Sequence, residues 1–168
     1  MLITKRTRVK DVLPLLNENN MEKFLDIIPP QPLNTPILSL TIGDFADIIL
    51  DEESYIKTLL QPRNRAYLAF GQLKQFRIEM KNLTDYLNKM QVKQTPDEIQ
   101  ASRGIEQVDF IGRMLIDVTK FFNLHSFTEA ENIKLSDYIL ILKDNVANAQ
   151  YQRNFSKILE QKSKTKKK

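Results

Sequence analysis

An apolar repeat between residues 64 and 91 constrains the fold more than any other feature of the sequence. Apolar side chains recur there at alternating spacings of three and four residues, the period of a helix that packs along one seam. The spacing predicts a helix of about 25 residues over 64–91. The seam positions are Ala66, Ala69, Leu73, Phe76, Met80, Leu83, Leu87 and Met90.

Two further segments predict long helices, over 96–122 and 135–161. Thr95 followed by Pro96 is typical of a helix start, and a wide apolar stripe follows it as far as Phe122. Apolar residues at helical spacing also run from Leu135 to Leu159. We therefore expect a mainly α fold with three long helices and short accessory helices around them. The first two long helices follow each other directly, which favours an intramolecular hairpin over an intermolecular coiled coil.

The first 40 residues have a different character. Four prolines lie within eight residues, and each one fixes φ and holds its predecessor in extended geometry. We call residues 29–38, which contain Pro29, Pro30, Pro32 and Pro36, the proline strap. We interpret 1–40 as an extended arm with short helices, although a connector laid across its own domain fits the same residues. The alternation in 37–42 also allows one short strand, paired with 2–9 as a minor β pair.

The basic residues are concentrated at the two ends of the chain. The sequence holds 25 basic and 21 acidic residues, with four cations in the first ten positions and five in the last seven. Residues 11–160 therefore carry 16 basic against 21 acidic residues. A slightly acidic body differs from the basic face of a dedicated nucleic-acid-binding domain. We expect a helical domain over 41–161 and a disordered lysine-rich tail over 162–168.

That tail has two readings, because a lysine run either contacts phosphates nonspecifically or is simply solvated. The candidate polyanion contacts are Lys162, Lys164, Lys166, Lys167 and Lys168.

The sequence contains no recognisable motif for catalysis or for metal or cofactor binding. His125 is its single histidine and cysteine is absent, whereas a metal site usually needs three or more protein ligands. The four glycines form no phosphate-binding loop or dinucleotide fingerprint. An acidic group lacks the spacing of a calcium loop and is better explained as charges near helix starts. It comprises Asp44, Asp47, Asp51, Glu52 and Glu53. We expect a protein that is not an enzyme and has no cofactor or metal.

The apolar runs are too short to cross a membrane, which needs about 20 residues. No secretory signal follows Met1. We therefore expect no membrane association, and a location in the cytosol or in an assembled particle.

Two segments carry a resemblance to a known class of proteins. Leu40-Thr41-Ile42-Gly43-Asp44-Phe45 leads into short helices, and the helical region ends in Ala149-Gln150-Tyr151-Gln152-Arg153-Asn154-Phe155. In this order of segments, over residues 37–160, the chain resembles the small helical virion and assembly proteins of tailed bacteriophages. These include tail-assembly chaperones and head-to-tail or packaged accessory proteins. The resemblance implies contact with other virion proteins, in the host cytoplasm or the virion, and no catalytic residues.

The leading hypothesis is a non-enzymatic protein–protein interaction module, most simply a bacteriophage structural or virion-assembly protein that contacts virion components or itself. The second half of the last helix is polar with sparse apolar positions, which suits a helix that projects toward a partner. The alternative is a nucleic-acid-associated accessory protein that binds phosphates through its basic tail. The candidate partner contacts are Leu33, Ile37 and Leu38 in the strap, and Tyr151, Phe155, Ile158 and Leu159 in the last helix.

Overall fold

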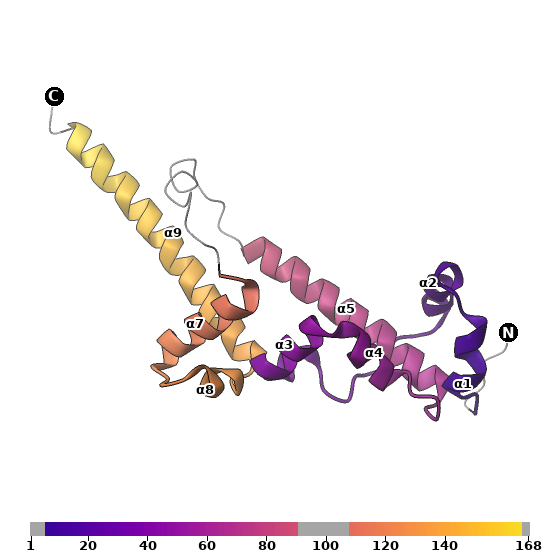
Figure 1. Cartoon of the computed structure of the whole chain (residues 1–168). Helices are drawn as coiled ribbons and strands as arrows, with labels where there is room; N and C mark the ends of the chain where they lie inside the picture. Colours follow the sequence, from indigo (N-terminus) through magenta and orange to yellow (C-terminus); the bar gives the residue numbers. More distant parts are fainter. Residues whose placement is uncertain (1–5, 91–107, 166–168) are drawn as a thin grey trace. The chain divides into compact units, whose positions relative to one another are not determined.

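The computed structural model describes residues 6–90 and 108–165, and in these residues the fold is all-α (Figure 1). The described part contains eight α-helices, two short 3-10 helices and no strand. Its elements are α1 (Val9–Val12), η1 (Leu13–Leu15), α2 (Glu18–Ile27), η2 (Ile37–Ser39), α3 (Ile42–Leu50), α4 (Glu52–Leu59), α5 (Ala66–Met90), α7 (Phe110–Phe122), α8 (Phe127–Glu131) and α9 (Leu135–Thr165). The chain divides into two compact units, residues 1–85 and 86–168.

The predicted long helices at 64–91 and 135–161 are confirmed as α5 and α9. The helix predicted over 96–122 is confirmed as α7 from Phe110 onward and is wrong at 108–109, because Asp109 is the N-cap at which the helix begins; residues 96–107 lie outside the described part. The hairpin between the first two long helices stays a prediction. The tail prediction is wrong for 162–165, because α9 continues through Thr165, whereas 166–168 lie outside the described residues. Lysine has good helix propensity, so a lysine-rich sequence can extend a helix that is already formed.

The suggested strand at 37–42 is wrong. Residues Ile37–Ser39 form the 3-10 helix η2, and α3 begins at Ile42. Thr41 caps α3 by accepting a hydrogen bond from the Asp44 N–H at 3.1 Å, so the chain turns where a strand would continue. The part of 2–9 that is described contributes only an isolated bridge between Arg8 and Arg65.

The first unit is built on the first part of α5, whose small side chains allow close approach of other segments. Helix α2 packs on it through the rings of Phe24 and Phe70, which meet edge to face with centroids 5.0 Å apart. The Lys74 ammonium group donates to the Asp26 carbonyl at 3.0 Å and fixes the same pair of helices. The side chains that α5 buries are Ala66, Ala69, Phe70, Gln72, Leu73, Phe76 and Leu83.

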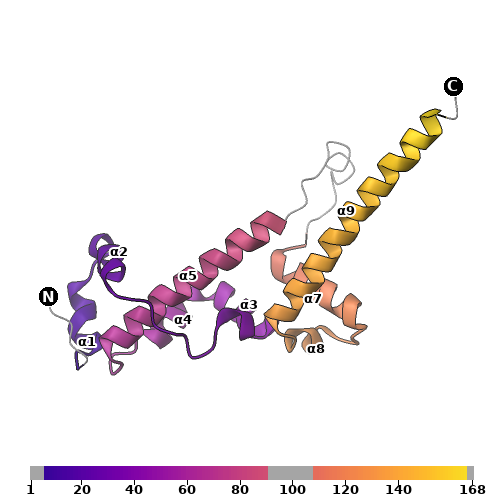
Figure 2. The same cartoon turned by 180° about the vertical axis from the view of Figure 1, so that it is seen from behind.

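The proline strap lies along α5, as the two opposite views show (Figures 1 and 2). Gln31 donates its backbone N–H to the Gly71 carbonyl at 3.0 Å. The Gln72 amide donates to the Pro32 carbonyl at 3.2 Å, and the Glu79 carboxylate accepts from the Ile37 N–H at 2.8 Å. Contacts therefore advance along α5 as the strap advances, so the two segments run in the same direction. The strap is a connector fixed to its own unit and not a free arm.

This placement corrects two of the predicted partner contacts. Leu33 is 7% exposed and Ile37 is 1% exposed, so both belong to the core of the first unit. Leu38, the third candidate in the strap, is about half exposed. The reason is the fixed course of the strap, because hydrogen bonds to α5 at Gln31, Pro32 and Ile37 hold this stretch in the first unit.

The second unit consists of α7, α8 and α9 with the last residues of α5. Asp109 caps α7 by accepting from the Gly112 N–H at 2.7 Å, and Asn123 ends the helix in the left-handed conformation with φ of 53°. Helix α7 packs against both α8 and the first half of α9. The buried side chains of this unit are Met114, Val118, Ala130, Leu135, Tyr138, Ile139 and Ile141.

We expect Gly71→Ala to lower the free energy of unfolding, although alanine is the better helix former by about 1 kcal/mol. An added Cβ would lie 2.9 Å from the Gln31 Cβ and 3.0 Å from the Pro29 carbonyl oxygen. Overpacking of this kind typically costs about 1–3 kcal/mol, so the net loss should be about 1 kcal/mol in urea denaturation.

The matched control is Thr84→Ala, an exposed position on the same helix. It gains helix propensity without a clash and should stabilise by a few tenths of a kcal/mol, roughly. Equal stabilisation by both substitutions would show that the strap does not press on α5.

We expect Tyr138→Phe to reduce the loss of stability at alkaline pH. Burial of Tyr138, reinforced by the nearby Asp117 carboxylate, raises its pKa from 10.0 to about 12, although Arg113 opposes this. The folded state therefore disfavours the ionised phenolate. The stability that the protonated Tyr138 hydroxyl contributes is complete below pH 10.0 and is lost as pH rises toward about 12.

Urea denaturation at pH 9 and at pH 11 measures this difference, with Tyr151→Phe as the control at an exposed tyrosine of the same helix. The wild-type chain and Y151F should lose more free energy of unfolding between the two pH values than Y138F. Equal losses in all three proteins would exclude Tyr138 as the responsible group.

Candidate functional site

The distal half of α9 carries four of the predicted partner contacts on one exposed face. Tyr151, Phe155, Ile158 and Leu159 are between 45 and 63% exposed. Their spacing of four, three and one residues brings them to one side of the helix. The Tyr151 and Phe155 rings stack with centroids 6.1 Å apart and an interplanar angle of 10°. We call these four residues the α9 stripe.

The stripe is exposed because the distal half of α9 has no core to face within its unit. The first turns of the helix bury Leu135, Tyr138 and Ile141, whereas no described side chain from Leu142 to Ser163 is buried. Figure 1 shows this end of α9, drawn in yellow, continuing past α7 and α8. Four large apolar side chains thus remain in water on a helix that packing holds only at its first half.

The stripe lies in a strongly basic stretch of chain. Residues 149–168 contain seven cations and one carboxylate, Glu160. Lys157 and Lys162 are exposed on the described part of the helix. Lys164 lies on α9 without a described side chain, and Lys166, Lys167 and Lys168 lie outside the described residues. An apolar face with basic flanks is complementary to an apolar surface with an acidic rim.

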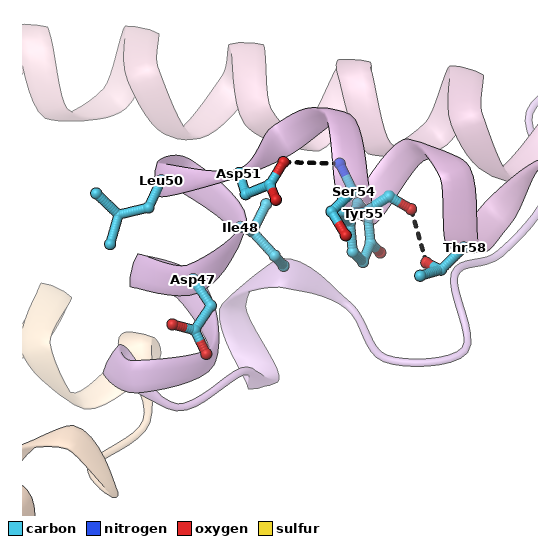
Figure 3. Close-up of a pocket in the computed structure, with 7 residues that line it drawn as sticks. All are labelled: Asp47, Ile48, Leu50, Asp51, Ser54, Tyr55 and Thr58. Carbon is cyan, nitrogen blue, oxygen red and sulfur yellow. Dashed lines mark hydrogen bonds between the residues drawn. The ribbon is translucent and has the colours of Figure 1, made fainter.

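A hollow of about 400 Å³ opens between α3 and α4 in the first unit (Figure 3). The Asp47 and Asp51 carboxylates lie at this hollow, and burial together with the nearby Glu79 raises the pKa of the Tyr55 hydroxyl. Leu50 at its edge is almost fully exposed. Its described lining residues are Asp47, Ile48, Leu50, Asp51, Ser54, Tyr55 and Thr58.

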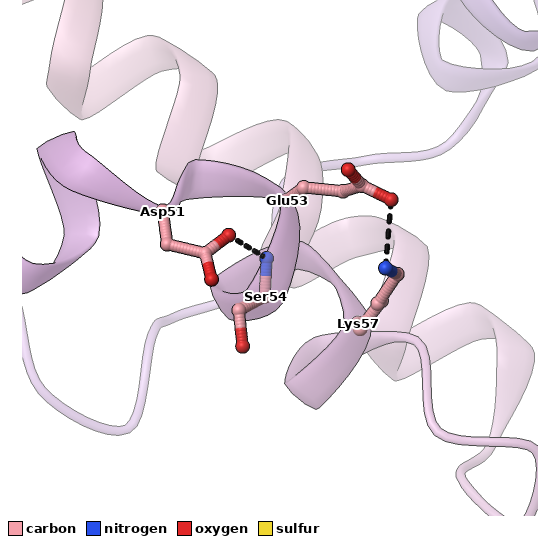
Figure 4. Close-up of polar contacts among 4 residues, drawn as sticks. All are labelled: Asp51, Glu53, Ser54 and Lys57. Atoms are coloured by element: carbon pink, nitrogen blue, oxygen red, sulfur yellow. Dashed lines mark hydrogen bonds and ion pairs between the residues drawn. The ribbon is translucent and has the colours of Figure 1, made fainter.

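The acidic group in residues 44–53, of which only Asp47 and Asp51 line this hollow, lies mainly at helix starts, as the sequence predicted. Asp51 caps α4 by accepting from the Ser54 N–H at 2.9 Å (Figure 4). Glu53 pairs with Lys57 at 2.7 Å, and both side chains are exposed. Asp44 and Glu52 lie in the first turns of α3 and α4. These roles account for four of the five carboxylates without a ligand.

A second hollow, of about 230 Å³, is lined by Arg8, Lys10, Pro62 and Arg63. In the sequence, Arg8 and Lys10 belong to the basic N-terminal end, and no local pattern connects them with Arg63. The signal that could have linked them, pairing of the N-terminal segment with the turn before α5, depends on contacts between positions more than 50 residues apart.

The described residues contain no group of three or more histidine, cysteine, aspartate or glutamate side chains placed to hold a metal ion. His125 lies in the turn between α7 and α8, where its backbone N–H donates to the Glu129 carboxylate at 3.1 Å. Within the described ranges, no helix is both long and apolar enough to span a bilayer.

Comparison of the chain with models of protein families, with curated proteins and with solved structures finds no match.

We expect Asp51→Ala to destabilise the chain by about 1 kcal/mol, because it removes the oxygen that caps α4. The matched control is Asp51→Asn, which removes the charge but keeps a capping oxygen and should stay close to the wild type. Thermal denaturation followed by circular dichroism measures both variants. If D51N lost as much stability as D51A, the carboxylate charge and not the cap would be the important feature.

Proposed function

We propose that this chain is a non-enzymatic protein–protein interaction module that binds its partner through the α9 stripe. The observation that supports the proposal is the set of four large exposed apolar side chains on a helix half in which no described side chain is buried. Contiguous exposed apolar surface of this kind marks interaction sites in soluble proteins. Such a face is typical of helices that lie in the groove of another protein.

The charge around the stripe supports a partner of complementary, acidic chemistry. With seven cations against one carboxylate in residues 149–168, two copies of this segment aligned in parallel would repel each other. A partner with an apolar centre and an acidic rim gains both burial and charge attraction. We therefore favour a heterologous acidic partner over pairing of two α9 stripes.

We infer a bacteriophage setting for this function from the resemblance to small helical proteins of tailed bacteriophages. In that setting the partner is another virion protein, and the chain acts during assembly or remains in the particle. The proposal assigns no catalytic step to the chain.

The double substitution F155Q/I158Q should weaken partner binding by about tenfold or more, because burying one large apolar side chain contributes about 1.5–3 kcal/mol. The probe is a labelled helical peptide with leucines on one face and glutamates on both flanks, titrated by fluorescence anisotropy. Both residues are exposed, so the melting temperature should change by no more than about 2 °C.

The matched control is S156Q, an exposed substitution on the same helix half that lies off the stripe. This variant should bind like the wild type, and a peptide with lysine flanks should bind more weakly than the glutamate peptide. If F155Q/I158Q bound the glutamate peptide as tightly as the wild type does, the stripe would not be the binding surface.

The bacteriophage setting needs a separate test. Light scattering during size-exclusion chromatography should detect a complex between the full chain and a purified virion protein, and F155Q/I158Q should abolish it. If the wild-type chain and F155Q/I158Q formed the complex equally well, this result would contradict the proposed contact through the α9 stripe.

A further inference from the structure

The N-terminal segment is joined to the turn that precedes α5 by a series of backbone hydrogen bonds. Ala66 donates to the Thr7 carbonyl at 2.8 Å, and Val9 donates to the Asn64 carbonyl at 3.0 Å. Lys10 donates to the Pro62 carbonyl at 3.3 Å. Val9 is fully buried beside these bonds, so the basic N-terminal segment is part of the folded first unit.

This pairing brings together cations that lie more than 50 positions apart in the sequence. The Arg8 guanidinium donates to the Arg63 carbonyl, and Arg8, Lys10 and Arg63 line the hollow of about 230 Å³ together with Pro62. Arg8 also forms an antiparallel bridge with Arg65, and side chains of residues paired in this way lie on the same side of the backbone. Four exposed cations therefore share one surface.

Little negative charge offsets this group. The Asp11 carboxylate accepts from the Arg8 backbone N–H at 3.2 Å and is the one acidic side chain that touches the segment among the described contacts. The ion pairs found within the described residues join Lys57 to Glu53 and Arg77 to Glu22, and involve none of the four cations. The Arg8 guanidinium spends one donor on the Arg63 carbonyl, and its other N–H groups and the side-chain donors of Lys10, Arg63 and Arg65 are available to an anion from outside.

We propose that the hollow formed by Arg8, Lys10 and Arg63, with Arg65 beside it, binds the phosphate backbone of a nucleic acid strand. The arginine fork matches the geometry of phosphate oxygens, and lysine adds a point charge. Four cations spread over one face exceed what a single phosphate needs, which favours a chain of phosphates over an isolated ion. Among the described residues, the lining of the open hollow includes no aromatic side chain on which a base could stack, so we expect binding to be independent of sequence.

This site is distinct from the α9 stripe and from the lysine tail, and does not rest on the proposed protein partner. The substitutions F155Q/I158Q should leave nucleic acid binding unchanged. Failure of one proposal therefore leaves the other standing.

The test measures binding of the full chain to a labelled 20-nucleotide single-stranded DNA by fluorescence polarisation between 50 and 200 mM salt. The variant is K10Q/R63Q, which keeps Arg8 because its guanidinium bonds to the Arg63 carbonyl. Each phosphate contact contributes about −0.7 to the logarithmic salt slope for a single strand. Loss of two phosphate contacts should reduce the magnitude of the salt slope by about 1.4. The rise from 50 to 200 mM salt weakens binding of both proteins, and the loss of affinity in K10Q/R63Q should be about sevenfold smaller than in the wild type.

The matched control is K23Q/K81Q, which removes two exposed lysines of the same unit outside the hollow and should keep the wild-type slope. A second full-length variant replaces the five tail lysines by glutamine. In that background, K10Q/R63Q should still lower the affinity. A wild-type slope in K10Q/R63Q, with binding lost only in the tail variant, would overturn the proposal and assign binding to the tail.

Two further probes test which kind of anion binds the hollow. Inorganic phosphate should compete only weakly, and a glutamate peptide of equal charge should bind more weakly than the DNA. Equal binding of the peptide, with the same dependence on Lys10 and Arg63, would overturn the proposal in favour of an acidic protein. Binding of phosphate without DNA would overturn it in favour of a free anion. An unchanged melting temperature for K10Q/R63Q confirms that the variant is folded.

Discussion

The first unit depends on how α5 satisfies the polar backbone of the proline strap. Proline removes N–H donors and prevents regular pairing, so the strap's carbonyls need donors from elsewhere. Gln72, buried in the first part of α5, donates its amide to the Pro32 carbonyl and to the Asn34 side chain at 3.3 Å. Glu79, two turns along the helix, accepts the Ile37 N–H. A buried amide without partners would cost about 1–3 kcal/mol, so Gln72 is tolerated in an apolar face only because the strap is seated there. Ile37 in turn is buried only when the strap is in place, which makes the polar contacts and the core mutually dependent.

The difference between what the sequence predicted and what it missed follows from the range of the interactions. The helices α5 and α9 were predictable because their periodicity and helix propensity are local properties of 25 to 31 residues. The burial of Leu33 was not, since an apolar residue between prolines has the same pattern whether it faces its own core or a partner. Its environment is set by bonds to α5 such as that between Gln31 and Gly71, 40 positions later.

The four stripe residues were found by periodicity, and their exposure agrees with the expectation that distal α9 has no core. The basic hollow was missed because the charges were counted along the chain, whereas Lys10 and Arg63 meet only after folding.

The average charge of the body likewise conceals how its charges are used. Much of the acidic excess in residues 11–160 serves local backbone structure. Asp51 and Asp109 cap α4 and α7, while the Asp11 carboxylate accepts the Arg8 N–H at the start of α1. Carboxylates at these positions compensate the exposed N–H groups of helix starts and are therefore tied to the backbone. The Lys10 side chain, by contrast, has no backbone partner among the described contacts. A body that is acidic on average can therefore present a basic surface at one place.

The distal half of α9 raises a related question of stability, because an isolated helix of this length is marginal in water. Within its own unit this half gains no buried contact between Leu142 and Ser163, so its helicity must be supported along the chain. The buried turn around Tyr138 supplies a formed nucleus, and propagation from a nucleus costs much less than initiation. Side-chain hydrogen bonds four residues apart add support, from Asn148 to Asp144 at 3.0 Å and from Gln150 to Asn154 at 3.2 Å. A partner that covered the stripe would therefore meet a helix that is already formed. Less conformational entropy would be lost on binding than for a segment that folds only in the complex, which increases the affinity available from a small apolar face.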